Sequence, residues 1–196
     1  MTLPDRWNGQ SVVDIHGFVV ESLRGELAGL RDCASVVIEN SRANQAIQSR
    51  THAAVLHLIG APDLGVLLRI IADDLPPLLD VDVGALAVEK AGAVDLFLPD
   101  VPRLGVGAVD HLVGCGQPVK LYRDFTDDGA IFGAASGLVR SAALCRLRVE
   151  PAGPAALFAL GARDPAAFHP GQGTELLRFL SDVVEVCLNR ILVTST

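Results

Sequence analysis

The strongest constraint on the fold is an alternation of apolar and polar residues at 141–150, SAALCRLRVE. Its apolar members Cys145, Leu147 and Val149 share one side of an extended chain, and charged residues share the other. The next run, AALFALGA at 155–162, is apolar throughout and predicts a central strand. We therefore expect an antiparallel sheet with one solvated face and one dry face that is covered by helices.

A long apolar helix is predicted at the end of the chain, over residues 175–192. Its apolar residues cover more than the one stripe that a single core face requires. We therefore expect the sheet on one side of this helix, and either another subunit or the N-terminal helices on the other. The preceding turn ends in Gly173 and Thr174, which we predict to be the turn residue and the N-cap of the helix.

Earlier in the chain, further strands are predicted at 83–90, 93–99 and 118–125, with a hairpin turn at Ala91-Gly92 and a short helix at 104–112. A helix is also predicted from the N-cap Asp63 to the pair Pro76-Pro77. Because the main helices come before and after the strands instead of alternating with them, the order predicts an α+β fold.

The N-terminal part is predicted to be helical, with an apolar stripe over 11–30 and a proline-free stretch over 31–59 whose middle is polar. Two interpretations stay open: a long helix that pairs between two subunits, or two shorter helices that fold back on their own domain. The sequence Gly-Ala-Pro at 60–62 ends the stretch. We accordingly assign residues 1–59 to an N-terminal helical segment for dimerisation or linkage, and residues 60–196 to the main domain.

The charge balance argues against polyanionic partners. Sixteen basic and twenty-three acidic residues give the 196-residue chain a net charge of −7, and its only lysines are Lys90 and Lys120. Nucleic acid and anionic membranes are therefore unfavoured partners. The N-terminus has no signal-peptide pattern, and the chain has no run of eighteen apolar residues. These features predict a cytoplasmic protein.

Four cysteines lie far apart, at 33, 115, 145 and 187, without the spacing of a metal site or a redox pair. The five histidines also lack metal spacing, so no metal or other cofactor is expected. Cys145 and Cys187 occupy apolar positions and are predicted to be buried free thiols. Cys115 lies in the glycine-flanked loop GCGQP at 114–118 and is predicted to be exposed.

Several segments together resemble one bacterial family. These are SRAN at 41–44, LHLI at 56–59, SAAL at 141–144 and LGARDPAAFHPGQGTELLRFL at 160–180. The chain resembles the family called domain of unknown function 484, whose signature reads G-S-x-D-x-x-x-F-x-P-x-x-G-T-x-F-L. The signature falls on Gly161, Asp164, Phe168, Pro170, Gly173, Thr174 and Leu177. Ala162 and Leu176 depart from it, in place of serine and phenylalanine.

The resemblance covers roughly residues 15–192 and implies a GAF-like fold with a long N-terminal helix, present as a homodimer. Genes of the family often lie beside a tyrosine recombinase, which implies a shared pathway and a possible protein partner. The resemblance supplies no catalytic residue, so none is carried over to this chain.

A ligand site is predicted at Arg123, Arg140 and Ser141. Arg123 falls between Leu121 and Phe125 on the apolar side of its strand, where a charge needs a partner. A bidentate contact to a ligand carboxylate or phosphate would provide one. The alternatives are that the strand ends at Tyr122, which leaves Arg123 in water, or that a nearby acid pairs with it. Arg140 and Ser141 would line the mouth of the same pocket, or simply begin their strand.

Three functions are compatible with these residues. The first is a non-enzymatic GAF-like regulatory or sensor module, homodimeric, which binds a small ligand beneath the sheet and acts through a protein partner. The second is a protein-interaction scaffold whose pocket is filled by its own side chains. The third is a thiol-dependent reductase of GAF fold that uses Cys115 and would need a second thiol.

Overall fold

A computed structural model describes residues 15–90, 101–150, 153–171 and 173–194 of the chain. The chain divides into two compact units, Met1–Ala46 and Ile47–Thr196. The predicted strand at 93–99 and the predicted hairpin turn at Ala91-Gly92 lie outside the described residues. Within the described ranges, no helix is both long enough and apolar enough to cross a membrane.

Helix α1 (Ile15–Ile59) runs for 45 residues and spans both predicted N-terminal segments without interruption. The interpretation as two shorter helices is therefore wrong, because no proline interrupts the segment and its glycines do not break it. In the first unit, the side chains described from Val19 to Ala46 are all exposed. In the second unit, the last turns of α1 bury Thr51, Ala54 and Leu58.

Three short helical segments follow: α2 (Leu64–Arg69), the π-helical turn η1 (Ile70–Asp74) and α3 (Leu75–Leu79). Asp63 is the N-cap of α2, as predicted, and its carboxylate accepts a hydrogen bond from the Val66 N–H at 2.8 Å. The prediction that Pro76-Pro77 ends the helix is wrong, because both prolines lie in the first turn of α3. A first turn tolerates proline since its N–H groups have no helical acceptor.

The sheet has five strands in the order β2-β1-β5-β4-β3. Only β1 and β2 run parallel among the described pairs, and the other three pairs are antiparallel, so the sheet is mixed. The fold is α+β, as predicted. β5 lies in the centre and is buried along its whole length, as its sequence indicates. The strands are β1 (Val83–Glu89), β2 (Arg103–Leu104), β3 (Val119–Arg123), β4 (Ser141–Leu147) and β5 (Ala156–Ala162).

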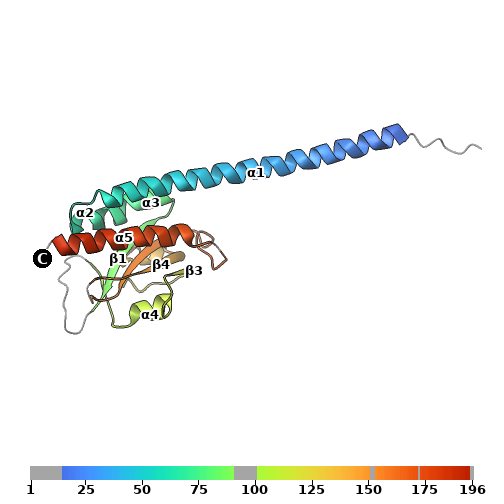
Figure 1. The fold of residues 1–196 in the computed structure, drawn as a ribbon. Helices are drawn as coiled ribbons and strands as arrows, with labels where there is room; N and C mark the ends of the chain where they lie inside the picture. Colours follow the sequence, from blue (N-terminus) through green and yellow to red (C-terminus); the bar gives the residue numbers. More distant parts are fainter. Residues whose placement is uncertain (1–14, 91–100, 151–152, 172, 195–196) are drawn as a thin grey trace, which may run out of the picture. The chain divides into compact units, whose positions relative to one another are not determined.

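One face of the sheet packs on helices and contains the larger core. Cys145 and Leu147 lie on this face as predicted, beside Phe158 of the central strand. Helix α5 (Glu175–Thr194) runs along this face (Figure 1) and buries Val184 and Leu188 against it. We call it the α5 face. The end of α1, α2, η1 and α3 contribute to the same core.

The opposite face is also covered, which contradicts the prediction of a solvated face. Helix α4 (Ala108–Val113) lies on it (Figure 1), together with the segment 125–139, which includes the 3-10 helix η2 (Gly133–Leu138). Ala142 and Leu144 of β4 are fully buried there. Of the charged residues that suggested water, Arg146 lies within β4 and pairs with Asp110 of α4, while Arg148 and Glu150 come after the end of the strand. We call this the α4 face.

Helix α5 begins directly after Thr174, whose carbonyl oxygen accepts a hydrogen bond from the Arg178 N–H at 2.9 Å. Thr174 therefore occupies the N-cap position. Part of the excess apolar surface of α5 remains exposed in the single chain, at Leu176, Phe179, Val186 and Val193.

Candidate functional site

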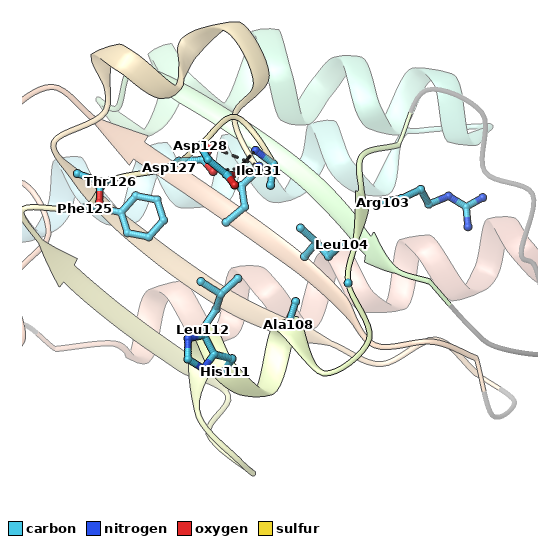
Figure 2. Close-up of a pocket in the computed structure, with 12 residues that line it drawn as sticks. Arg103, Leu104, Ala108, His111, Leu112, Phe125, Thr126, Asp127, Asp128 and Ile131 are labelled. Carbon is cyan, nitrogen blue, oxygen red and sulfur yellow. Dashed lines mark hydrogen bonds between the residues drawn. The ribbon is translucent and has the colours of Figure 1, made fainter.

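A groove of about 610 Å³ lies on the α4 face of the second unit. It lies between β2, α4 and the segment that follows β3. Figure 2 shows apolar side chains from these three elements directed toward the space. They are Leu104, Ala108, Leu112, Phe125 and Ile131. The wall resembles a binding surface for an apolar group, because ligand sites are mostly apolar with a few polar groups.

Polar side chains surround the groove at Arg103, His111, Thr126, Asp127 and Asp128. Arg103 extends away from the other lining side chains (Figure 2), and His111 is exposed. His111 therefore offers a hydrogen-bonding group at the edge of the groove, while the middle of the groove is apolar.

Asp127 and Asp128 shape the loop that forms one wall. The Asp127 carboxylate accepts hydrogen bonds from the Phe132 N–H at 2.8 Å and from the Ile131 N–H at 3.3 Å. The Asp128 carboxylate accepts one from the Ala130 N–H at 3.1 Å. Such contacts between an aspartate and nearby backbone groups fix a turn. The acids hold Ile131 at the groove and are already engaged with the backbone.

Helix α4, the second wall, is held by polar contacts at both ends. Glu89 Oε1 accepts a hydrogen bond from the Val109 N–H at 2.6 Å, which binds the start of α4 to β1. Arg146 of β4 contacts the Asp110 carboxylate at 2.6 Å and the Gly114 carbonyl oxygen at 2.8 Å. The Tyr122 hydroxyl donates to the Leu112 carbonyl oxygen. The helix has only six residues and would not be stable alone.

The predicted ligand residues lie at one end of the sheet, outside the groove. Strand pairing places Arg123 opposite Ser141, and Arg140 directly precedes Ser141. Both arginines are exposed, so the premise that Arg123 lies on a buried face is wrong. β3 ends at Arg123 because Asp124 adopts a left-handed conformation with φ of 58°. Arg123 is therefore the last residue of the strand and lies in water, and the turn brings Phe125 to the α4 face instead of the face that holds Leu121.

Ser141 is fully buried, and its hydroxyl donates a hydrogen bond to the Asp164 carbonyl oxygen at 2.6 Å. That bond connects β4 to the turn after β5. Asp164 also accepts a hydrogen bond on its carboxylate from the Ala166 N–H at 2.8 Å. Ser141 thus has a structural partner inside the protein. Gly173 lies two residues before the first residue of α5 and is exposed.

Sequence reasoning missed the groove residues. The sequence predicts Phe125 on the apolar side of a strand, and it gives no sign that Asp127 and Asp128 lie beside a groove. A usable signal was the run Asp-Asp-Gly at 127–129, which marks a fixed turn between two apolar segments. That signal predicts a turn but does not indicate that the turn faces α4.

The thiols differ in environment. Burial, with a smaller contribution from the negative charge of Asp182, raises the pKa of Cys145 to about 12. Burial also raises the pKa of Cys187. Cys33 and Cys115 are exposed. Within the described part of the chain, no three His, Cys, Asp or Glu side chains lie close enough together to hold a metal ion.

Comparison with known proteins gives one family. The model of the family described as "Protein of unknown function, DUF484" matches residues 6–193. This chain therefore belongs to the DUF484 family. No curated protein matches the chain.

Proposed function

We propose that this member of the DUF484 family is a non-enzymatic regulatory module of GAF-like fold, which acts as a homodimer and binds a small molecule in the groove on the α4 face. The observation that carries the proposal is the apolar-walled groove of about 610 Å³ between β2, α4 and the loop after β3. Its volume falls in the range of small-molecule sites.

The chemistry of the lining indicates the class of ligand. Leu104, Leu112 and Phe125 would contact an apolar or aromatic body. His111 lies at the edge and would hydrogen-bond a polar end group. The carboxylates of Asp127 and Asp128 already accept backbone N–H groups, so they favour a ligand that does not bring a further negative charge to that side.

A route from ligand to response is supported by the attachment of the two walls. α4 is bound to β1 through Glu89 and to β4 through Arg146. A ligand that contacts both Leu112 and Ile131 would favour the state in which α4 and the loop are closest. In this proposal a protein partner, such as a component of a tyrosine recombinase pathway, reads the resulting change.

The test compares two variants that differ only in whether the new ring enters the groove. In Ala108→Phe the ring fills the space, because Ala108 lines the wall. Val106→Phe is the control, since Val106 is 80% exposed and does not line the groove. We expect compounds that raise the melting temperature of the wild type to act equally on Val106→Phe and not on Ala108→Phe.

The magnitude is measurable, because a ligand at 100 times its dissociation constant stabilises by about 2.7 kcal/mol. Native mass spectrometry of gently purified protein gives a second readout. If the native spectrum contains no bound compound and a broad metabolite panel causes no shift, ligand binding is rejected.

A second candidate is a protein-interaction scaffold without a ligand. It is favoured by the exposed apolar residues of α1, among them Leu23, Leu27 and Leu30. Two results together would support the scaffold: no compound binds in the groove, and deletion of residues 1–35 abolishes binding of a protein partner.

The third candidate, a reductase that uses Cys115, lacks support from the surrounding thiols. Cys145 and Cys187, the other cysteines of the second unit, are both buried and would not serve as a resolving thiol. A redox activity lost in Cys115→Ser would be needed to revive it.

A further inference from the structure

The first unit presents an apolar stripe whose side chains are exposed in the part of the chain that the structure describes. Along α1, apolar residues recur at alternating steps of three and four from Val20 to Val37. All of them are exposed, and Leu30 is 67% exposed. We call this set the α1 stripe: Val20, Leu23, Leu27, Leu30, Ala34 and Val37. A surface helix with this repeat has the pattern of one strand of a coiled coil.

The heptad positions follow from the stripe. Val20, Leu27 and Ala34 occupy position a, and Leu23, Leu30 and Val37 occupy position d. The stripe turns polar at Ser41 and Asn44, which ends the apolar contact. Gly25 and Gly29 fall at positions f and c, away from the stripe, where no other atom lies within 4 Å of a Cβ. They weaken the isolated helix, so the segment gains from a partner helix.

The charges beside the stripe are complementary to a second copy in one orientation. Glu26 falls at position g and Arg31 at position e of the next heptad; both are exposed. In a parallel, in-register pair, a g residue faces the e residue of the next heptad on the other helix. Two symmetric Glu26–Arg31 pairs would therefore form, one on each side.

The antiparallel arrangement places like charges together. With the two apolar stretches fully overlapped, the e positions face one another, so that Arg24 meets Arg31 of the other copy twice. Glu26 would then face Cys33, which carries no compensating charge. Like charges across a helix pair oppose association and set orientation.

We propose that the α1 stripe binds the α1 stripe of a second copy as a parallel, in-register, two-stranded coiled coil fixed by Glu26–Arg31 pairs. This inference rests on the homodimer in the proposed function and adds its surface and orientation. It does not depend on the groove or on any ligand.

Cysteine crosslinking of the full chain tests the register. The background is Cys33→Ser with Cys115→Ser, which removes both exposed thiols. Leu30→Cys places identical d residues face to face, with Cα atoms about 6 Å apart and within disulfide range. Asp32→Cys, at the outward position f, is the matched control. We expect mild oxidation to give a disulfide dimer of twice 20.6 kDa for Leu30→Cys and not for Asp32→Cys.

Charge reversal tests the orientation. Arg31→Glu faces Glu26 in the parallel pair and should weaken the dimer about tenfold, measured by sedimentation equilibrium. The double variant Glu26→Arg with Arg31→Glu should recover the wild-type dissociation constant. In the antiparallel pair, Arg31→Glu would instead face Arg24 and tighten the dimer.

The outcomes separate the two proposals. A chain that stays monomeric at every concentration rejects the homodimer and this interface with it. A dimer that Arg31→Glu tightens, or one that fails to crosslink through Leu30→Cys, rejects the parallel stripe and leaves the homodimer standing on another surface.

Discussion

The two faces of the sheet are both buried, but they are covered by different means. On the α5 face, a helix of 20 residues and three shorter helical segments pack on large apolar side chains. On the α4 face, a six-residue helix and a loop are attached through polar contacts and leave a groove. The comparison suggests that the α5 face supplies most of the stability, while the α4 face leaves room for a ligand.

Thiol reactivity gives the largest expected difference between the faces. Cys145 belongs to the α5 face core, whereas Cys115 lies in the turn after α4. With its pKa raised from 9.0 to about 12, the Cys145 thiol carries about 1,000 times less thiolate at pH 8 than an ordinary thiol. We expect iodoacetamide to label Cys115 and Cys33 rapidly and Cys145 only in denaturant, as mapped by peptide mass spectrometry. Rapid labelling of native Cys145 would show that this core opens easily.

Truncation of one phenylalanine on each face compares their packing. Phe158→Ala on the α5 face should destabilise by about 4 kcal/mol, because a fully buried ring leaves a cavity in a closed core. Phe125→Ala at the groove should cost about 2 kcal/mol, since the ring already borders open space. Chemical denaturation measures both. If both variants lost the same free energy of unfolding, the two faces would not differ in how tightly they are packed.

Two glycines of the sheet permit a matched comparison of overpacking. A Cβ on Gly84 would lie 2.1 Å from the backbone oxygen of Ile71 on the α5 face. The three atoms nearest to a Cβ on Gly161 all belong to side chains of the α4 face, and the closest is on Val83 at 2.8 Å. We expect Gly84→Ala to cost about 3 kcal/mol and Gly161→Ala about 1 kcal/mol, because side chains move more easily than backbone. The free energy of unfolding is measured by urea denaturation. A larger loss for Gly161→Ala than for Gly84→Ala would contradict the close packing of β1 against η1.

The smallest expected effect concerns the attachment of α4. Arg146→Met keeps the apolar stem and removes the contacts to Asp110 and Gly114. Because Arg146 is half-buried, we expect the free energy of unfolding to fall by about 1 kcal/mol. Amide exchange should rise in α4 and stay unchanged in α5. Equal acceleration in both helices would mean that Arg146 supports the whole fold and not the groove wall.

The pattern of the strands was predictable because side-chain alternation is a local property. The positions of Cys145 and Leu147 on one face, the full burial of β5 and the cap at Asp63 followed from sequence. The exposure of Arg123 was not predicted, because the alternation does not show that β3 ends at this residue, before the left-handed Asp124. Pro76 was misassigned since the π-helical turn before it lets a new helix begin.

The sequence by itself determined the α+β class, four of the five described strands (β1, β3, β4 and β5), the closing helix and the family, since each depends on periodicity or on a short signature. Only the tertiary structure decided that the second face is covered and that the groove exists. Its walls come from β2, α4 and the loop at 125–131, and each of these segments is unremarkable alone. Their meeting depends on how the sheet orders its strands, which is a long-range property that no local pattern encodes.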